Sequence, residues 1–249
     1  MALPSAAVFE RAGLKAWPGI EVEWDGAWVR RATNGYTKRA NSVQSLDIAD
    51  DANAPARLAA AIDWFGARGL PPVFRITPLA GAGIIAALDA QGWGSLDASY
   101  QYAMTLAPGA PEPGGQIYDV FDPDYLAIHQ RLAGYSEARQ AGLKGLLAAL
   151  TVPARGIVLR NDAGVPVASG LMAIADDIVV TGNVVTDPGQ RRKGHAAAMM
   201  RTGHAWAYGA GARIAALNVQ ADNVGAQALY QGLGYTHQYD YHYRLPGGL

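Results

Sequence analysis

Three consecutive cations in the C-terminal half lie between a β-branched segment and a run of small residues. The segment reads Val184-Val185-Thr186-Asp187-Pro188-Gly189-Gln190-Arg191-Arg192-Lys193-Gly194-His195-Ala196. The first residues predict a strand that stops at Asp187-Pro188, and the residues from Gly194 predict the start of a helix. A helix N-terminus presents free backbone N–H groups and about half a positive charge, so added cations are unfavourable there unless an anion binds. The segment therefore predicts a phosphate or pyrophosphate site.

Other interpretations of this segment explain less of it. Arg191, Arg192 and Lys193 alone would fit a solvated basic loop before a surface helix. Gly189–Gly194 has Walker-like spacing, but His195 and Ala196 stand where a Lys followed by Ser or Thr is needed. No Gly-x-Gly-x-x-Gly opens a helix after a strand, which argues against a dinucleotide fold.

A second segment follows at a separation that gives the first one more weight. It reads Leu217-Asn218-Val219-Gln220-Ala221-Asp222-Asn223-Val224-Gly225-Ala226-Gln227-Ala228-Leu229-Tyr230-Gln231-Gly232-Leu233-Gly234-Tyr235. Arg191 to Ala196 resembles the GNAT pyrophosphate motif, Arg/Gln-x-x-Gly-x-Gly/Ala. The second segment resembles the later GNAT signature, in which a strand leads to Asn, Ala, Leu-Tyr and a Gly-aromatic pair. The two signatures occur in family order, and the chain is identified as a member of the GNAT N-acyltransferases.

The resemblance implies acetyl-CoA as cosubstrate and assigns a role to each matched residue. Val184, Val185 and Thr186 match the strand that hydrogen-bonds the pantetheine arm and the acetyl carbonyl. Arg191 to Ala196 match the pyrophosphate cradle. Asn223 matches a side chain that meets the pantetheine, and Ala226 matches a small residue beside it. The implied reaction is direct attack by a primary amine of a small molecule or peptide on the acetyl group.

Tyr230 matches the hydroxyl proposed in the family to protonate the leaving thiolate. A tyrosine has a reference pKa near 10 and is protonated at neutral pH, so it can donate to sulfur. By composition alone it would be an ordinary packing tyrosine. Family members often carry a Glu on the strand before the phosphate loop, and this strand has none, so the base is unassigned; Glu137 is more typical of a helix surface. A non-catalytic acyl-CoA-binding module is the alternative.

The run Ala107–Gly115 consists almost entirely of Pro, Gly and Ala and predicts a linker. We therefore predict a lobe over residues 1–106, a linker over 107–115 and a catalytic domain over 116–249. The halves share an offset of 142 residues, which pairs Trp64 with Trp206, Gly69 with Gly211, Gly92 with Gly234 and Trp93 with Tyr235. The repeated elements are Ala56–Arg68, Val73–Ile76, Ile84–Gln91 and Ala98–Leu106, then Ala196–Tyr208, Ile214–Val219, Gly225–Gly232 and His237–Leu245.

The region between the linker and the second copy predicts a helical stretch and consecutive hairpins. The helical stretch covers Tyr125–Leu150, and the strands cover Gly156–Arg160, Val165–Ile174 and Ile178–Thr186. Hairpins followed by helix–strand–helix–strand predict a mixed α/β (α+β) fold, not a doubly wound parallel sheet. With the resemblance, the fold class is tandem GNAT-like folds, each a mostly antiparallel sheet flanked by helices.

The first copy keeps the pattern but lacks the site, and we predict a degenerate GNAT-like lobe. Asp50-Asp51 stands where the second half has Arg-Arg-Lys, and Leu88 stands at the offset position of Tyr230. The polar run Asn34–Val43 would either line an acceptor pocket or form a hairpin turn. We expect residues 1–106 not to bind CoA but to be needed for the acceptor. Residues 116–249 are long enough to be expected to fold alone.

Composition limits the remaining classes of function. Formal net charge is −1 over 249 residues, which argues against binding to nucleic acid. There are no cysteines, and the five histidines lack metal-ligand spacing, so no metal site is expected. No apolar run is long enough to span a membrane, and the N-terminus is no convincing signal peptide, so we expect a cytoplasmic protein. The expected oligomeric state is a monomer or homodimer.

Overall fold

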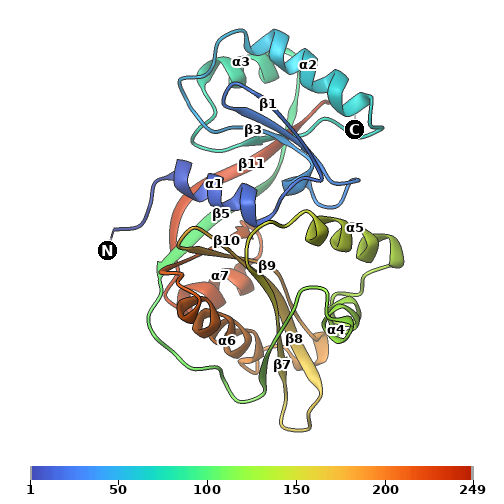
Figure 1. Cartoon of the computed structure of the whole chain (residues 1–249). Helices are drawn as coiled ribbons and strands as arrows, with labels where there is room; N and C mark the ends of the chain where they lie inside the picture. The colour runs from blue at the N-terminus through green and yellow to red at the C-terminus, as the bar shows by residue number, and fades with distance from the viewer. Residues whose placement is uncertain (1, 248–249) are drawn as a thin grey trace.

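The β-branched and aromatic runs of the chain form strands of one sheet, and the alanine- and leucine-rich runs form helices around it. The structure is a computed structural model that describes residues 2–247. Figure 1 shows the arrangement of the elements. The α-helices are α1 (Ala6–Ala16), α2 (Ala54–Gly66), α3 (Ala82–Ala90), α4 (Pro123–Ala133), α5 (Glu137–Ala148), α6 (His195–Gly209) and α7 (Val224–Gly232).

The sheet has 11 strands in the order β1-β2-β3-β4-β11-β5-β10-β9-β8-β7-β6. Their bounds are β1 Glu21–Asp25, β2 Trp28–Ala32, β3 Val43–Ser45, β4 Phe74–Ile76, β5 Gly94–Thr105, β6 Gly115–Tyr118, β7 Ala154–Arg160, β8 Pro166–Ala175, β9 Ile178–Thr186, β10 Ile214–Gln220 and β11 Thr236–Leu245. Most neighbours pair antiparallel; β3–β4 and β9–β10 pair parallel. The mixed, mostly antiparallel sheet flanked by helices confirms the predicted fold class.

The element order α2–β4–α3–β5 recurs as α6–β10–α7–β11, as the internal repeat predicts. The glycines that end corresponding helices also share a backbone conformation. Gly69 and Gly211 have φ of 63° and 103°, and Gly92 and Gly234 have φ of 68° and 98°. This left-handed region favours glycine because it has no Cβ, so the repeat preserves positions where the backbone requires it.

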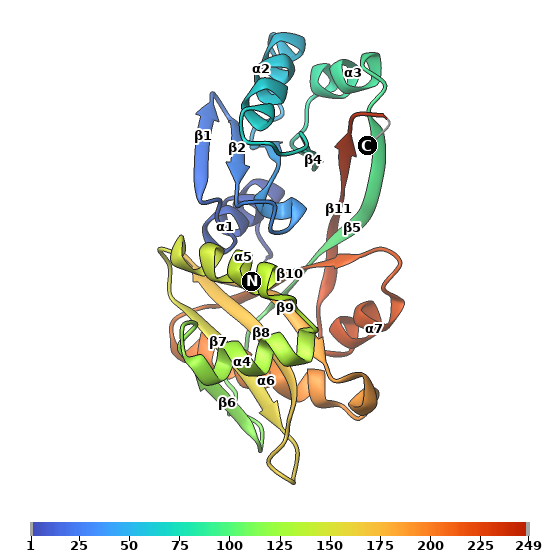
Figure 2. The same ribbon diagram turned by 90° about the vertical axis from the view of Figure 1, so that its right-hand side faces the viewer.

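The two repeats exchange their last strands. β5 of the first repeat pairs with β10 of the second, from Ile214↔Thr105 to Gln220↔Ser99. β11 of the second repeat pairs with β4 of the first and also with β5. Figure 2 shows β5 and β11 running together from one group of helices to the other. Residues 107–114 form no helix or strand, and Gly115 already belongs to β6. How the chain divides into folding units stays a prediction.

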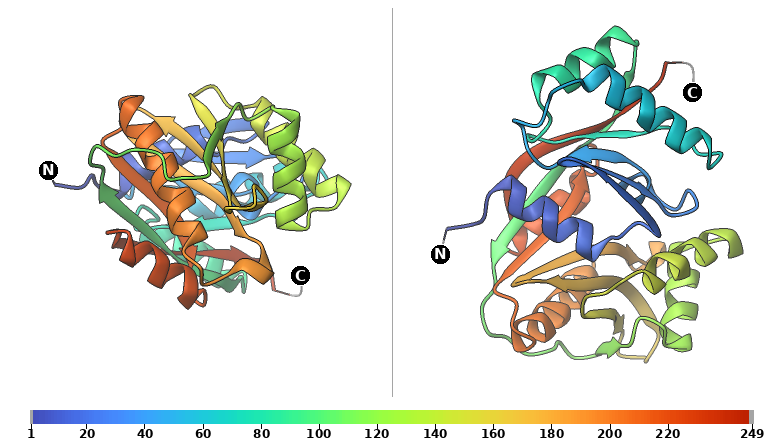
Figure 3. Two further views of the ribbon diagram at one scale, coloured as in Figure 1. Left: turned by 90° about the horizontal axis from the view of Figure 1, so that it is seen from below. Right: turned by 45° about the horizontal axis from the view of Figure 1, so that its top comes forward.

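Helices cover both faces of the second-half sheet. α6 and α7 pack on one face, where Met199 and Met200 are fully buried, and α1, α4 and α5 lie on the other, where Leu146 is fully buried. The two views in Figure 3 show these two groups of helices on different sides of the sheet. Burying a side chain of this size contributes about 1.5–3 kcal/mol. α1 belongs to the first half but packs on β8 and β9, so a second contact ties the halves together.

The predicted helical stretch Tyr125–Leu150 is two helices. The break falls at Gly134, where φ is 64°. Ser136 then caps α5 by accepting a hydrogen bond from the Arg139 backbone N–H at 3.3 Å. Gly at the end of one helix and Ser at the start of the next are ordinary stop and start signals, and the apolar periodicity across them conceals the break.

Two structural features of the described residues relate to the expectations drawn from composition. Over residues 2–247, no helix combines the length and the apolar character needed to cross a membrane. Within the same residues, no group of three or more His, Asp or Glu side chains is arranged to hold a metal ion. The expectation that the chain has no metal site stays a prediction.

Candidate functional site

The site begins where β9 and β10 separate. The two strands pair in parallel from Ile214↔Ile178 to Leu217↔Thr181, and both then continue without pairing to each other. Here β9 also shifts its register against β8, and Asn183 has a positive φ of 52°. This is a β-bulge, which interrupts a ladder and redirects the strand. The gap leaves backbone groups of β9 beyond the bulge available to a ligand.

A cavity of about 510 Å³ extends from this gap to the start of α6. We call it the helix-end cavity. Its walls come from β9, the loop before α6, and α7. Its lining residues are Val184, Val185, Thr186, Arg191, Arg192, Gly194, His195, Ala196, Ala197, Asn223, Gly225, Ala226, Leu229 and Tyr230. The structure thus brings together the residues of both sequence signatures around one space.

Of the residues predicted to bind the cofactor, Lys193 is placed differently. Its ammonium donates to Gln190 Oε1 at 2.9 Å, and it is not among the residues that line the helix-end cavity. Arg191 and Arg192 therefore line the helix-end cavity, whereas Lys193 forms a hydrogen bond within the loop.

The N-terminus of α6 has the geometry of an anion site. Gly194 is its N-cap at φ 81°, and Arg192 also has a positive φ of 62°. Within the described chain no side chain caps this helix, whereas Asp122 caps α4. A Cβ built on Gly194 would meet no atom within 4 Å, so the space beside it is open to a ligand. The first-turn N–H groups have no partner within the helix and suit phosphate oxygens.

The start of α7 forms the opposite wall. Asn223 caps this helix by accepting a hydrogen bond from the Ala226 backbone N–H at 3.1 Å. Tyr230 lies farther along the same helix and is 7% exposed. Burial raises the pKa of Tyr230 to about 12, so its hydroxyl keeps its proton at neutral pH.

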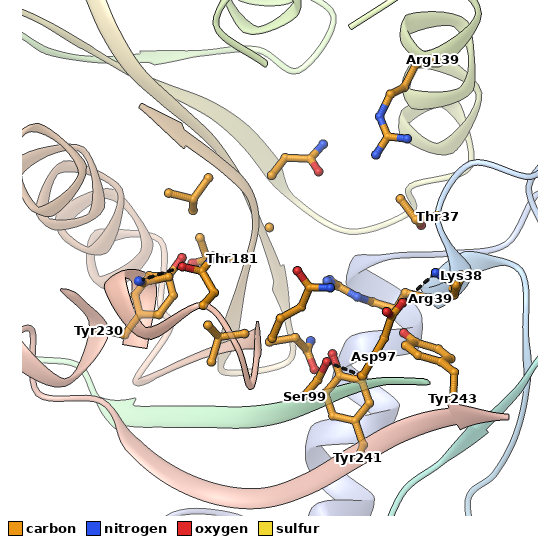
Figure 4. A pocket seen from close by; sticks show the side chains of 18 of the residues that line it. Thr37, Lys38, Arg39, Asp97, Ser99, Arg139, Thr181, Tyr230, Tyr241 and Tyr243 are labelled. Carbon is orange, nitrogen blue, oxygen red and sulfur yellow. Dashed lines mark hydrogen bonds and ion pairs between the residues drawn. The ribbon is translucent and has the colours of Figure 1, made fainter. Parts of the chain in front are cut away.

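A second cavity of about 560 Å³ adjoins the first, and we call it the interlobe cavity. Both cavities are lined by Val184, Asn223, Ala226 and Tyr230, so they meet at these residues. Figure 4 shows Tyr230 and Thr181 on one side of the interlobe cavity and Arg139, Lys38 and Tyr243 on the other. A molecule in one cavity would therefore meet a molecule in the other beside Tyr230.

The first half contributes directly to the interlobe cavity. Thr37, Lys38 and Arg39 line it and lie on the connection between the antiparallel strands β2 and β3. The run Asn34–Val43 therefore contains the hairpin connection and also forms part of the wall of the interlobe cavity; that this cavity takes the acceptor stays a prediction. Tyr36 in the same connection accepts a hydrogen bond from Asn183 Nδ2 at 3.0 Å, which joins it to the bulge.

The sequence interpretation missed several lining residues. They are Asp97 and Ser99 of β5, Arg139 of α5, and Tyr241 and Tyr243 of β11. On each of these strands the missed residues are two apart, a spacing that usually places side chains on one face of a sheet. This spacing is the sequence feature from which they could have been predicted as a group. Which face of β5 and β11 lies toward the interlobe cavity depends on the exchange of these strands between the repeats. No local sequence pattern predicts that exchange.

Asp97 is the sole carboxylate among the described residues that line either cavity. It forms an ion pair with Lys38, with Nζ and Oδ2 2.7 Å apart. Glu137 is exposed at the first turn of α5 and lines neither cavity. Arg139, two residues farther along, does line the interlobe cavity.

In the first lobe, the space that corresponds to the helix-end cavity is occupied by the side chain of Asp51. The Asp51 carboxylate accepts hydrogen bonds from the backbone N–H groups of Gly83 and Ile84, the latter at 2.8 Å. At the 142-residue offset these positions correspond to Gly225 and Ala226. Asp51 therefore reaches from the loop before α2 to the start of α3, across the space that the second lobe leaves open.

The splayed parallel strands, the uncapped helix after a bulged strand and the duplicated architecture define a tandem GNAT fold. The family described as "Probable histone acetyltransferase Rv0428c C-terminal" matches residues 7–244, and the chain belongs to this family. The chain is 26% identical over 242 residues to the "Uncharacterized N-acetyltransferase YobR" of Bacillus subtilis, which covers 95% of this chain and 96% of that protein.

Solved structures of low identity share the fold. A GCN5-related N-acetyltransferase from Kribbella flavida superposes with a TM-score of 0.75 at 21% identity, covering 100% of this chain and 98% of that one. A tandem GNAT protein from the clavulanic acid biosynthesis pathway superposes with a TM-score of 0.63 at 12% identity, covering 98% of this chain and 88% of that one. The family and the relative from Bacillus subtilis support N-acetyltransferase activity as the general class of function, and the solved structures support the fold.

Proposed function

We propose that the chain transfers an acetyl group from acetyl-CoA to a primary amine of a small molecule or peptide by direct attack. The observation that carries this proposal is the junction of the two cavities at Val184, Asn223, Ala226 and Tyr230. The helix-end cavity suits the cosubstrate because it ends at an uncapped helix N-terminus with Arg191 and Arg192 beside it. The interlobe cavity is left for the acceptor.

The residues around the junction supply what thioester aminolysis needs. Backbone N–H groups of β9 beyond the bulge would stabilise the developing oxyanion. Tyr230 keeps its proton at neutral pH and would donate it to the departing sulfur. Acetyl-CoA supplies an activated acyl group. The phosphate groups would lie at Arg191, Arg192 and the first turn of α6.

A non-catalytic acyl-CoA-binding module is the second candidate, and one observation favours it. No free carboxylate is placed to take a proton from the amine: Asp97, which lines the interlobe cavity, is paired with Lys38, and β9 carries no Glu. Such a module would bind acetyl-CoA through the same loop but would release no thiol when amines are added.

Calorimetry with acetyl-CoA tests the binding half of the proposal. We expect micromolar affinity, weakened about tenfold or more by Arg191→Ala because a charged hydrogen bond to phosphate is lost. Gly194→Val should weaken binding as well, since its side chain would enter the open space and strain a positive φ. Lys144→Ala is the control, because Lys144 is exposed and lines neither cavity.

Free-thiol release with a panel of amines, amino acids and peptides tests turnover. Release that depends on an added amine supports the enzyme, and acetyl-CoA binding with no release across the panel supports the binding module. Unchanged acetyl-CoA affinity in both loop variants, with unchanged circular dichroism spectra, would show that the assignment of the loop is wrong.

A further inference from the structure

The wall of the interlobe cavity that faces away from Tyr230 carries an excess of positive charge. Lys38, Arg39 and Arg139 all line it, against the single carboxylate of Asp97. Lys38 is paired with Asp97 at 2.7 Å, whereas among residues 2–247 neither Arg39 nor Arg139 has an ion-pair partner. Two guanidinium groups therefore face the cavity without a counter-charge.

Arg39 has the more unusual environment. It is partly buried, and its Nε and Nη1 atoms are fully shielded yet find no acceptor among the described residues. The guanidinium lies over the Trp17 ring, 5.2 Å from its centroid. Because this guanidinium lines the cavity and has no ion-pair partner among residues 2–247, an anionic group in the cavity would be stabilised beside it.

The protein behind this wall adds to the positive potential. A void of about 10 Å³ behind the cavity is lined by Arg31, Arg39, Arg75 and a single carboxylate, Glu10. Arg75 pairs with Glu10 and donates to Asn218 Oδ1 at 3.2 Å, and Asn218 itself lines the cavity. Burial, and then the charge of Arg75, lower the pKa of Arg31 to about 9, which still leaves it charged at neutral pH.

Arg139 reaches the interlobe cavity from α5, whereas Arg39 reaches it from the connection between β2 and β3. It lies in the first turn of α5, and its guanidinium is 4.9 Å from the centroid of the Tyr135 ring, which orients it. Figure 4 shows it extending from α5 into the space above Thr37 and Arg39. The two arginines come from different halves of the chain, so their joint position is a product of the assembled molecule.

We propose that the interlobe cavity takes an amine that carries a carboxylate, held by Arg39 and Arg139 while its amino group lies toward Tyr230. This inference rests on the proposed acetyl transfer and names its acceptor class. A carboxylate matches the planar fork of a guanidinium and gives charge-assisted hydrogen bonds. A lysine-rich peptide would bring like charge to the same wall and is disfavoured. The cavity volume of about 560 Å³ suits a small molecule.

The test compares acceptors that differ only in this charge. Acetyl-CoA turnover is measured with α-, β- and γ-amino acids, each paired with its own primary amide, and with a lysine-rich peptide. Rates are compared across pH so that differences in amine ionisation are removed. We expect the acid of at least one pair to exceed its amide in kcat/KM by about tenfold or more.

The variants separate binding of the carboxylate from the chemical step. Arg139→Ala should lower the ratio of kcat/KM for the acid to kcat/KM for its amide by about tenfold, because the amide has no carboxylate for this guanidinium to hold. Arg39→Gln should act in the same direction. Lys144→Ala, on the same helix as Arg139, should keep the preference.

The outcomes distinguish the two proposals. This inference is overturned if amines are acetylated but no acid is preferred over its amide, or if the lysine-rich peptide is the best acceptor. Either result would still support the proposed acetyl transfer. Failure to bind acetyl-CoA overturns the proposed function. In that case, or if acetyl-CoA binds without turnover, tryptophan fluorescence titrated with each acid of the panel and its amide decides whether the arginines bind a carboxylate. The change must depend on Trp17, which lies beside Arg39, and must be lost in Arg39→Gln.

Discussion

Tyr230 shows how one side chain can have a packing role and a chemical role. Its ring packs edge-on against Tyr235, with centroids 5.9 Å apart, while the residue lines both cavities. The burial that fixes the ring also raises the pKa of the hydroxyl to about 12. A phenol held neutral at the meeting point of two cavities suits the delivery of a proton to a leaving group.

We predict that Tyr230→Phe lowers kcat by about 100-fold while changing acetyl-CoA affinity little. Phe keeps the packing against Tyr235 and removes only the hydroxyl. The wild-type rate should also rise with pH as the acceptor amine loses its proton, with no falling limb until pH approaches 12. Steady-state kinetics and calorimetry measure both. A loss confined to acetyl-CoA affinity would make Tyr230 a binding residue.

The residues that the sequence predicted to lie together, and that do line one cavity, are those whose position depends on local order. Arg191 and Gly194 follow a strand and open a helix, and this order alone predicts an anion site. Asp97 and Arg139 depend on which segments meet in space. β5 reaches the site through the strand exchange, and Arg139 does so because α4 and α5 separate at Gly134.

At the scale of elements, two buried histidines connect helices to their neighbours. His129 of α4 lies 2.9 Å from Ser169 Oγ of β8, and His204 of α6 lies 2.8 Å from the Tyr235 hydroxyl. Burial lowers the pKa of each to about 4, below the usual value of about 6.5. Neither residue lines a cavity, so their effect falls on stability.

We predict that the fold loses stability as pH falls from about 6.5 to about 4. In this window the unfolded chain takes up protons that the folded chain excludes, so each histidine lowers the free energy of unfolding by about 3 kcal/mol on acidification. His204→Gln should flatten the dependence of the free energy of unfolding on pH, measured by urea denaturation. His237→Gln, at a half-exposed position, is the control. An equal slope in wild type and His204→Gln would contradict the assignment.

Some elements could not be predicted because their signal is weak without the fold. β1 alternates acidic residues with Val22 and Trp24, a pattern typical of a strand, but it is short and both apolar side chains are exposed, so burial does not reinforce the signal. β6 is a short edge strand directly after the predicted linker. α1 packs on β8 and β9, and nothing near it in sequence indicates that distant partner. In contrast, the predicted strand Ile178–Thr186 has the same bounds as β9.

At the scale of the whole molecule, the two repeats differ at the position of the helix-end cavity. Asp51 fills the gap of the first lobe, and the Asp50 carboxylate is held by Arg57 and the Ala27 backbone N–H. A Cβ at Gly81 would already meet Asp51 at 2.5 Å, so no space remains there for a phosphate.

We therefore predict one acetyl-CoA bound per chain, measured by calorimetry. Asp51→Ala should leave this stoichiometry unchanged, because removal of one carboxylate restores neither the basic loop nor the tyrosine that Leu88 replaces. It should lower the melting temperature by uncapping α3, with a cost of about 1 kcal/mol. A stoichiometry of two in the wild type would refute the degenerate-lobe prediction.

The exchange of β5 and β11 argues against the expectation that residues 116–249 fold alone. Without the first half, β10 and β11 would lose the strand between them. We predict that this fragment is insoluble or melts without cooperativity by circular dichroism. A full chain cut by a protease at a site inserted in 107–114 should stay associated in size-exclusion chromatography. Separation of the cut halves as folded species would contradict this.

The same exchange has a consequence for biosynthesis. A chain leaves the ribosome from its N-terminus, and domains generally fold in that order as they emerge. Here β4 and β5 both pair with β11, which is synthesised after every other strand of the sheet. Neither lobe can complete its sheet before β11 has left the ribosome, and until then these edges of β4 and β5 stay unpaired. Slower translation of the segment that encodes β11 should therefore increase aggregation of this protein more than that of a relative whose lobes close independently.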